Sequence, residues 1–111
     1  MIFLLIILDT GISLTLEPRE VDLAYLSPDV TTQPFTCSYE SDVLLRMELN
    51  TDPPSNLPVA IGDYRYNRKG VQTIDLPIRP NIRSIECSVF DQSGDKLSFA
   101  KSKVINGGGG E

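Results

Sequence analysis

The stretch Phe35-Thr36-Cys37-Ser38-Tyr39 and its counterpart Ile85-Glu86-Cys87-Ser88-Val89 decide the fold of this chain. In both stretches apolar residues alternate with polar ones, and a cysteine stands at the centre of the apolar series. Successive side chains of a β-strand point to opposite faces, so each cysteine is expected on the inward face of its strand. Two inward cysteines on well-separated strands predict a disulfide that joins packed sheets, with two buried free thiols as the alternative.

The composition excludes several classes of function. The chain has 111 residues and no histidine, so it lacks the usual general base and any Ser-His-Asp arrangement. Two cysteines without a histidine also cannot complete the usual structural zinc site. We therefore expect a protein that is not an enzyme and that holds no cofactor. The net charge of −5 argues against nucleic acid and anionic lipid as partners.

The N-terminal segment is a short apolar block, Met1 to Leu8, which stops at Asp9. It is well below the roughly 20 residues that a membrane span needs. Small residues follow at Gly11 and Ser13, which is the order of a secretory leader. We predict a signal peptide over residues 1–13, with a first strand or a truncated gene model as the alternatives. Secretion and a disulfide agree with each other, because disulfides persist in oxidising compartments. Direct membrane insertion is not expected.

The rest of the chain predicts a single all-β domain over residues 14–105, followed by a flexible glycine tail or linker at 106–111. Prolines and glycines recur at short intervals, and no stretch keeps a helical period. Strands are expected near residues 14–17, 21–26, 32–39, 43–49, 59–66, 72–76, 84–90 and 96–105.

Three local patterns add detail to this prediction. Asn67-Arg68-Lys69-Gly70 predicts a turn, with the glycine at positive φ. Asp91-Gln92-Ser93-Gly94-Asp95 predicts a hairpin turn, with a calcium site as the alternative. In the last strand Leu97 and Phe99 share one phase and Val104 has the other, which predicts a change of face at a bulge.

These features resemble the immunoglobulin superfamily over most of the predicted domain. The residues that carry the resemblance are Phe35-Thr36-Cys37-Ser38-Tyr39, Ile74-x-Leu76, and Asn81-x-x-x-Ile85-x-Cys87 followed by Ser88-Val89-Phe90-Asp91-x-x-Gly94. The family's tyrosine two residues before the second cysteine is replaced by Ile85, and its core tryptophan is absent. Met47 or Leu45 is therefore expected to fill the space beside the disulfide. Fibronectin type III and cadherin-like sandwiches are the alternatives.

The resemblance implies a two-sheet antiparallel immunoglobulin-like sandwich with one inter-sheet disulfide. It also implies an adhesion or surface-recognition module, secreted or at the extracellular face of the cell surface. A protein partner is expected, with another immunoglobulin-like domain as one option, and the alternative function is a structural spacer in a longer extracellular protein. The binding face would be the outward side of the sheet that contains the strands expected near residues 43–49, 84–90 and 96–105. Six residues are predicted there: Leu44, Arg46, Glu48, Glu86, Ser88 and Phe90.

Overall fold

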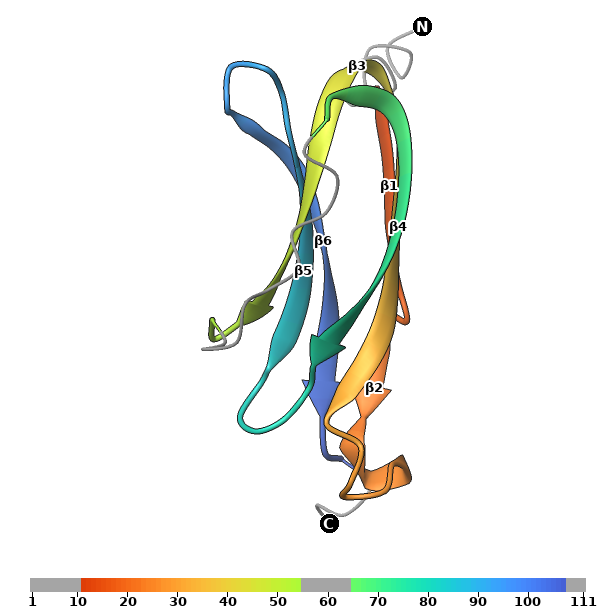
Figure 1. Ribbon diagram of the computed structural model, residues 1–111, viewed down its shortest axis with the longest axis vertical. Coiled ribbons are helices and arrows are strands. Elements are labelled where there is room, and N and C mark those ends of the chain that lie inside the picture. Colours follow the sequence, from red (N-terminus) through yellow and green to blue (C-terminus); the bar gives the residue numbers. More distant parts are fainter. Residues whose placement is uncertain (1–10, 55–64, 108–111) are drawn as a thin grey trace, which may run out of the picture.

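The computed structural model describes residues 11–54 and 65–107, and these residues form an all-β fold, as predicted. One 3₁₀ turn, η1, interrupts the strands. Figure 1 shows an elongated molecule in which long strands run along the vertical axis. The elements are β1 (Ile12–Glu17), β2 (Glu20–Asp22), η1 (Leu23–Tyr25), β3 (Thr32–Asp52), β4 (Asn67–Pro77), β5 (Ser84–Phe90) and β6 (Lys96–Ile105).

The strand β3 connects two groups of strands. Its first half pairs antiparallel with β1 on one side and β4 on the other. Its second half pairs antiparallel with β5, which in turn pairs with β6. In Figure 1, β3 climbs through the first group, arches over at the top and descends through the second. The strands predicted near 32–39 and 43–49 are the two halves of this element.

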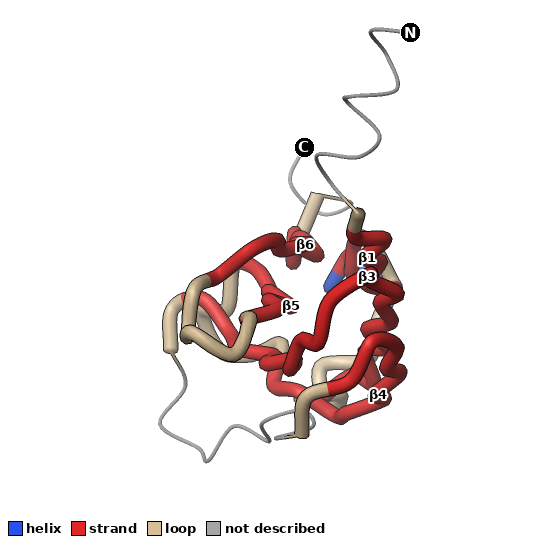
Figure 2. The backbone as a smooth tube through the Cα atoms, turned by 90° about the horizontal axis from the view of Figure 1, so that it is seen from above, coloured by secondary structure: helices blue, strands red, loops and turns tan. Residues whose placement is uncertain are grey.

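The sheet differs in two ways from the expected pair of separate antiparallel sheets. The short strand β2 pairs with the end of β6 in parallel, so the sheet is mixed. Because β3 belongs to both groups, the hydrogen-bonded path is continuous in the order β1-β3-β5-β6-β2. Figure 2 shows this path curling around the interior until β1 and β6 approach each other, which leaves the sheet nearly closed.

The core lies between the two groups and follows the predicted alternation. Phe35 and Cys37 from the first half of β3 are fully buried, as are Leu45, Met47 and Leu49 from its second half. Burial of each such apolar side chain stabilises the fold by about 1.5–3 kcal/mol. Both residues proposed to replace the absent tryptophan are therefore inside the core.

The predicted disulfide is confirmed. Cys37 on β3 and Cys87 on β5 are joined at an S–S distance of 2.07 Å, with Cα atoms 6.4 Å apart. Each half-cystine lies in a different group of strands. The bond therefore links the two groups across the core.

The arch of β3 is held by side chains near its ends. The Oγ of Ser41 accepts a hydrogen bond from the Val43 amide at 3.0 Å. The buried hydroxyl of Tyr39 donates to the carbonyl of Leu45 at 2.7 Å and lies 3.1 Å from that of Asn67. Leu45 and Asn67 are register partners, so one side chain bridges β3 to the start of β4.

The predicted turn at Asn67-Arg68-Lys69-Gly70 is wrong, because these residues begin β4. Gly70 is not among the described residues at positive φ, which include Gly11 and Gly94. Gly70 is instead the register partner of Tyr39, and a Cβ atom at this glycine would lie 2.7 Å from the Tyr39 ring. The glycine provides space for an aromatic ring from the neighbouring strand.

The Asp91–Asp95 segment is the predicted hairpin turn, with Gly94 at φ 90°. The Asp91 carboxylate accepts hydrogen bonds from the Ser93 and Asp95 amides at 2.9 and 3.0 Å. These bonds keep the Asp91 carboxylate within the turn.

The bulge predicted in the last strand is found near the start of β6: Val89 pairs with Ser98 and Phe90 with Lys96, so Leu97 is the extra residue. Leu97 and Phe99 are exposed, whereas Val104 is buried, and the alternation is regular from Ser98 onward. Across this bulge the alternation changes phase, so Lys96 and Phe99 both lie on the outer side as the register partners of Phe90 and Ser88. Most inward positions of β6 hold small residues, so a large apolar side chain does not identify the inner face of this strand.

Two predictions concern the ends of the chain. β1 begins at Ile12, two residues before the predicted start of the domain. Most of the predicted leader, residues 59–64 of the strand expected near 59–66 and most of the glycine tail lie outside the described residues.

Candidate binding face

The six predicted residues lie along the outer side of the second group of strands, which we call the outer face. It is formed by the second half of β3, by β5 and by β6. The register sets the outer-face residues in three rows across these strands: Arg46, Phe90 and Lys96, then Glu48, Ser88 and Phe99, then Asn50, Glu86 and Lys101. Five predicted residues therefore meet in this grid, and Leu44 precedes Arg46 by two positions along β3.

The first row centres on Phe90. The guanidinium of Arg46 lies 4.7 Å from the centroid of the Phe90 ring, a cation–π arrangement. The same guanidinium donates to Glu48 at 2.5 Å. This hydrogen bond is the largest cause of a raised pKa for Arg46, and a contact with Tyr66 adds to it. Arg46 therefore stays charged and covers part of Phe90.

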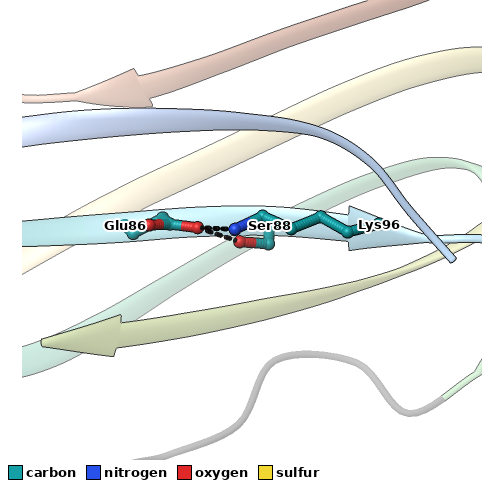
Figure 3. Close-up of polar contacts among 3 residues, drawn as sticks. All are labelled: Glu86, Ser88 and Lys96. Carbon is teal, nitrogen blue, oxygen red and sulfur yellow. Dashed lines mark hydrogen bonds and ion pairs between the residues drawn. The ribbon is translucent and has the colours of Figure 1, made fainter. Parts of the chain in front are cut away.

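A separate set of contacts on the outer face surrounds Glu86. Its Oε2 accepts a hydrogen bond from the Ser88 hydroxyl at 2.6 Å and another from the ammonium of Lys96. Figure 3 shows both donors directed at this carboxylate. Partial burial by itself raises the pKa of Glu86, but the bonds from Lys96 and Ser88 and the charges of Lys96 and Lys101 outweigh it, so the net pKa is lowered.

The prediction of an exposed apolar pair requires a correction. Leu44 is 38% exposed, as the alternation predicts, but Phe90 is half-buried under Arg46. Ser88 is buried as well, although its side chain belongs to the outer face, because its neighbours in the grid cover it. The ring that is open to solvent lies on the next strand.

That ring is Phe99, which the sequence-based prediction of the face omitted. It is 55% exposed, and the ammonium groups of Lys96 and Lys101 lie 4.9 and 5.9 Å from its centroid. Leu97 beside it is 43% exposed, and an open hollow is lined by Lys96, Leu97, Ser98 and Phe99. The sequence does contain a signal for the exposure of Phe99. The alternate residues Ser98, Ala100 and Ser102 are all small, which indicates that their face of β6 is the tightly packed one.

The outer face thus combines paired charges with two apolar groups at its margins, Leu44 on β3 and Phe99 on β6. Aromatic side chains are enriched in protein–protein interfaces, and the exposed ring of Phe99 is available for such a contact. Within residues 11–54 and 65–107, no three histidine, cysteine or acidic side chains are grouped so as to hold a metal ion. The same residues include no helix long and apolar enough to cross a bilayer.

The chain was compared with family models, curated proteins and solved structures. No family model matches this chain, and neither a curated protein nor a solved structure does.

Proposed function

We propose that this chain is a divergent immunoglobulin-like module that binds another protein outside the cell, without catalysis, through its outer face. The single observation that carries the proposal is the pair of exposed apolar anchors, Leu44 and Phe99, at the margins of a face on which Arg46 pairs with Glu48 and Lys96 with Glu86. Exposed apolar groups mark interaction sites where they adjoin one another, and Phe99 adjoins the exposed Leu97 in one hollow.

The arrangement of strands supports the immunoglobulin-like part of the proposal. An immunoglobulin sandwich has its A, B and E strands in one sheet and its C, F and G strands in the other, with a B–F disulfide. Here β1, the first half of β3 and β4 form one group, and the second half of β3, β5 and β6 form the other. The disulfide joins the members that would be B and F. The continuous β3 and the parallel β2 pairing would be variations on that plan.

The proposed extracellular location is supported by the same bond. A disulfide buried in the core is consistent with an oxidising compartment, and the apolar block at residues 1–8 would supply the secretory leader.

The proposal is tested by immobilising the folded, oxidised domain and measuring its binding to a panel of purified ectodomains that includes a second copy of itself. Leu44→Asp and Phe99→Asp, singly and together, should reduce binding to a captured ectodomain at least tenfold. Val71→Asp is the matched control, because Val71 is 61% exposed on β4 in the other group of strands. Far-UV circular dichroism establishes that each variant is folded.

Two results would overturn the proposal. One is equal binding by the double variant and the unmodified domain, and the other is an equal loss with Val71→Asp. If no ectodomain binds at all, the spacer function becomes the better explanation.

A further inference from the structure

One edge of β6 is open beside the outer face. β5 pairs with β6 along one side, whereas β2 covers the other side only at Lys103, Val104 and Ile105. No strand among the described residues hydrogen-bonds to positions 96–102 along that second side, although β1 also comes close to β6. In Figure 1 the β5–β6 hairpin diverges from β1 at the upper left, so the first half of β6 stands apart from the other group.

The backbone groups that face this edge follow from two hydrogen bonds. The Val104 amide donates to the Arg83 carbonyl at 2.9 Å, just before β5, and the Lys103 amide donates to the Arg19 carbonyl at 3.1 Å, on the side of β2. The direction of the backbone N–H and C=O groups alternates from residue to residue along a strand, so these groups of Phe99 and Lys101 point to the same side as those of Lys103. Their N–H and C=O groups therefore face the open edge, where a further strand would bond.

The charge of β6 indicates what such a strand would carry. The segment Lys96–Ile105 holds three lysines and no acid, in a chain whose net charge is −5. Lys96 is engaged with Glu86, but neither Lys101 nor Lys103 forms an ion pair with a described residue. An edge lined with lysines disfavours pairing with a second copy, because like charges on adjacent strands repel. The same lysines favour an acidic strand.

We propose that the open edge of β6 binds an extended acidic peptide segment of a partner protein, which adds to the sheet as a further strand. The backbone groups of Phe99 and Lys101 pair with the segment. Its carboxylates lie beside Lys101 and at the end of the open edge next to Lys103, where β2 begins to pair, and an apolar side chain covers Phe99 next to Leu97. This proposal names the class of partner for the recognition function proposed above and rests on it.

The test uses a synthetic peptide of about seven residues, the length that the open edge accommodates. With blocked ends, the peptide reads Glu-Ser-Glu-Ser-Tyr-Ser-Val, and its reverse sequence serves for the opposite strand direction. Two comparison peptides carry lysine in place of glutamate, or N-methyl groups at alternate positions so that they cannot pair with an edge. Binding is measured by fluorescence anisotropy, and amide hydrogen exchange is followed residue by residue by NMR.

We expect one acidic peptide to slow exchange of the Phe99 and Lys101 amides at least tenfold at saturation, and both comparison peptides to bind at least tenfold more weakly. Lys101→Glu should reverse the preference toward the lysine peptide. Lys69→Glu on β4 is the matched control, since Lys69 is exposed in the other group of strands, and it should leave the preference unchanged.

Several results would overturn the inference. Equal binding of the N-methylated peptide would exclude strand addition, and equal binding of the lysine peptide would exclude recognition of acidic groups. Absence of binding by either acidic peptide would exclude the site. A dimer of the domain alone, detected by sedimentation and altered by Lys101→Glu, would show that a second copy occupies the edge. If the peptides fail while ectodomain binding still depends on Leu44 and Phe99, only the edge proposal falls.

Discussion

Replacement of Tyr39 by phenylalanine tests how the arch of β3 is held. The substitution removes one hydroxyl and keeps the ring, which still packs over Gly70. The lost hydroxyl is the donor to the Leu45 carbonyl at 2.7 Å, a buried hydrogen bond, and it also lies 3.1 Å from the Asn67 carbonyl. Leaving a buried acceptor without its partner costs about 1–3 kcal/mol. The Asn67 carbonyl is only partly buried, so water can replace the hydroxyl there, and we expect a loss of about 1–2 kcal/mol.

The measurement is urea unfolding of the oxidised domain followed by far-UV circular dichroism. For a domain of this size the expected loss lowers the thermal midpoint by roughly 4–16 °C and moves the urea midpoint down without changing the slope. Tyr25→Phe is the matched control, because Tyr25 is 82% exposed and should change stability by less than about 0.5 kcal/mol. The reasoning is refuted if Tyr39→Phe and Tyr25→Phe unfold at the same urea concentration.

Three further predictions concern the core, a glycine and pH. Reduction of the disulfide, whose half-cystines are 50 positions apart, should lower the free energy of unfolding by about 4 kcal/mol in the chain-entropy model; oxidised and reduced samples with equal urea midpoints would contradict this. Gly70→Ala should cost about 1–3 kcal/mol, because its Cβ would press on the Tyr39 ring, whereas Gly107→Ala, with its nearest neighbour at 3.6 Å, should be near neutral in the same unfolding assay. The lowered pKa of Glu86 means that its ionised form contributes stability that is complete above the unfolded pKa of about 4.3 and is lost as the pH falls through the folded pKa. The thermal midpoint of Glu86→Gln should therefore lie below that of the unmodified domain at pH 7 and approach it near pH 3, and a constant gap would argue against the Lys96 contact as its cause.

The candidate face was only partly predictable from the chain. Arg46, Glu48 and Glu86 were assigned to the correct side by alternation, since their inward neighbours include buried residues of the core. Phe99 was not assigned to this side, because a large aromatic residue favours the interior when only its own strand is considered. The exposure of Phe99 depends on the neighbouring strand β5. The inward side chains Ile85, Cys87 and Val89 of β5 fill the interior beside β6 and leave space there only for the small side chains of their register partners.

Gly70 gives a second example of the same limit. A glycine after Asn-Arg-Lys suggests a turn, because local patterns report the backbone freedom of a residue and not the side chain that lies across from it. The Tyr39 ring that requires this glycine comes from β3, and only the register between the two strands brings them together.

The sequence by itself determined the all-β class, the inward direction of both cysteines and the turn at Asp91–Asp95. These properties follow from a period of two residues and from local hydrogen bonds, which neighbouring residues specify without a partner. The tertiary structure alone decided which face of β6 is buried, how β3 arches between the two groups of strands, and that β2 pairs with β6 in parallel. Those outcomes depend on contacts between segments that are distant in the sequence, and alternation identifies two faces of a strand without saying which of them another strand will cover.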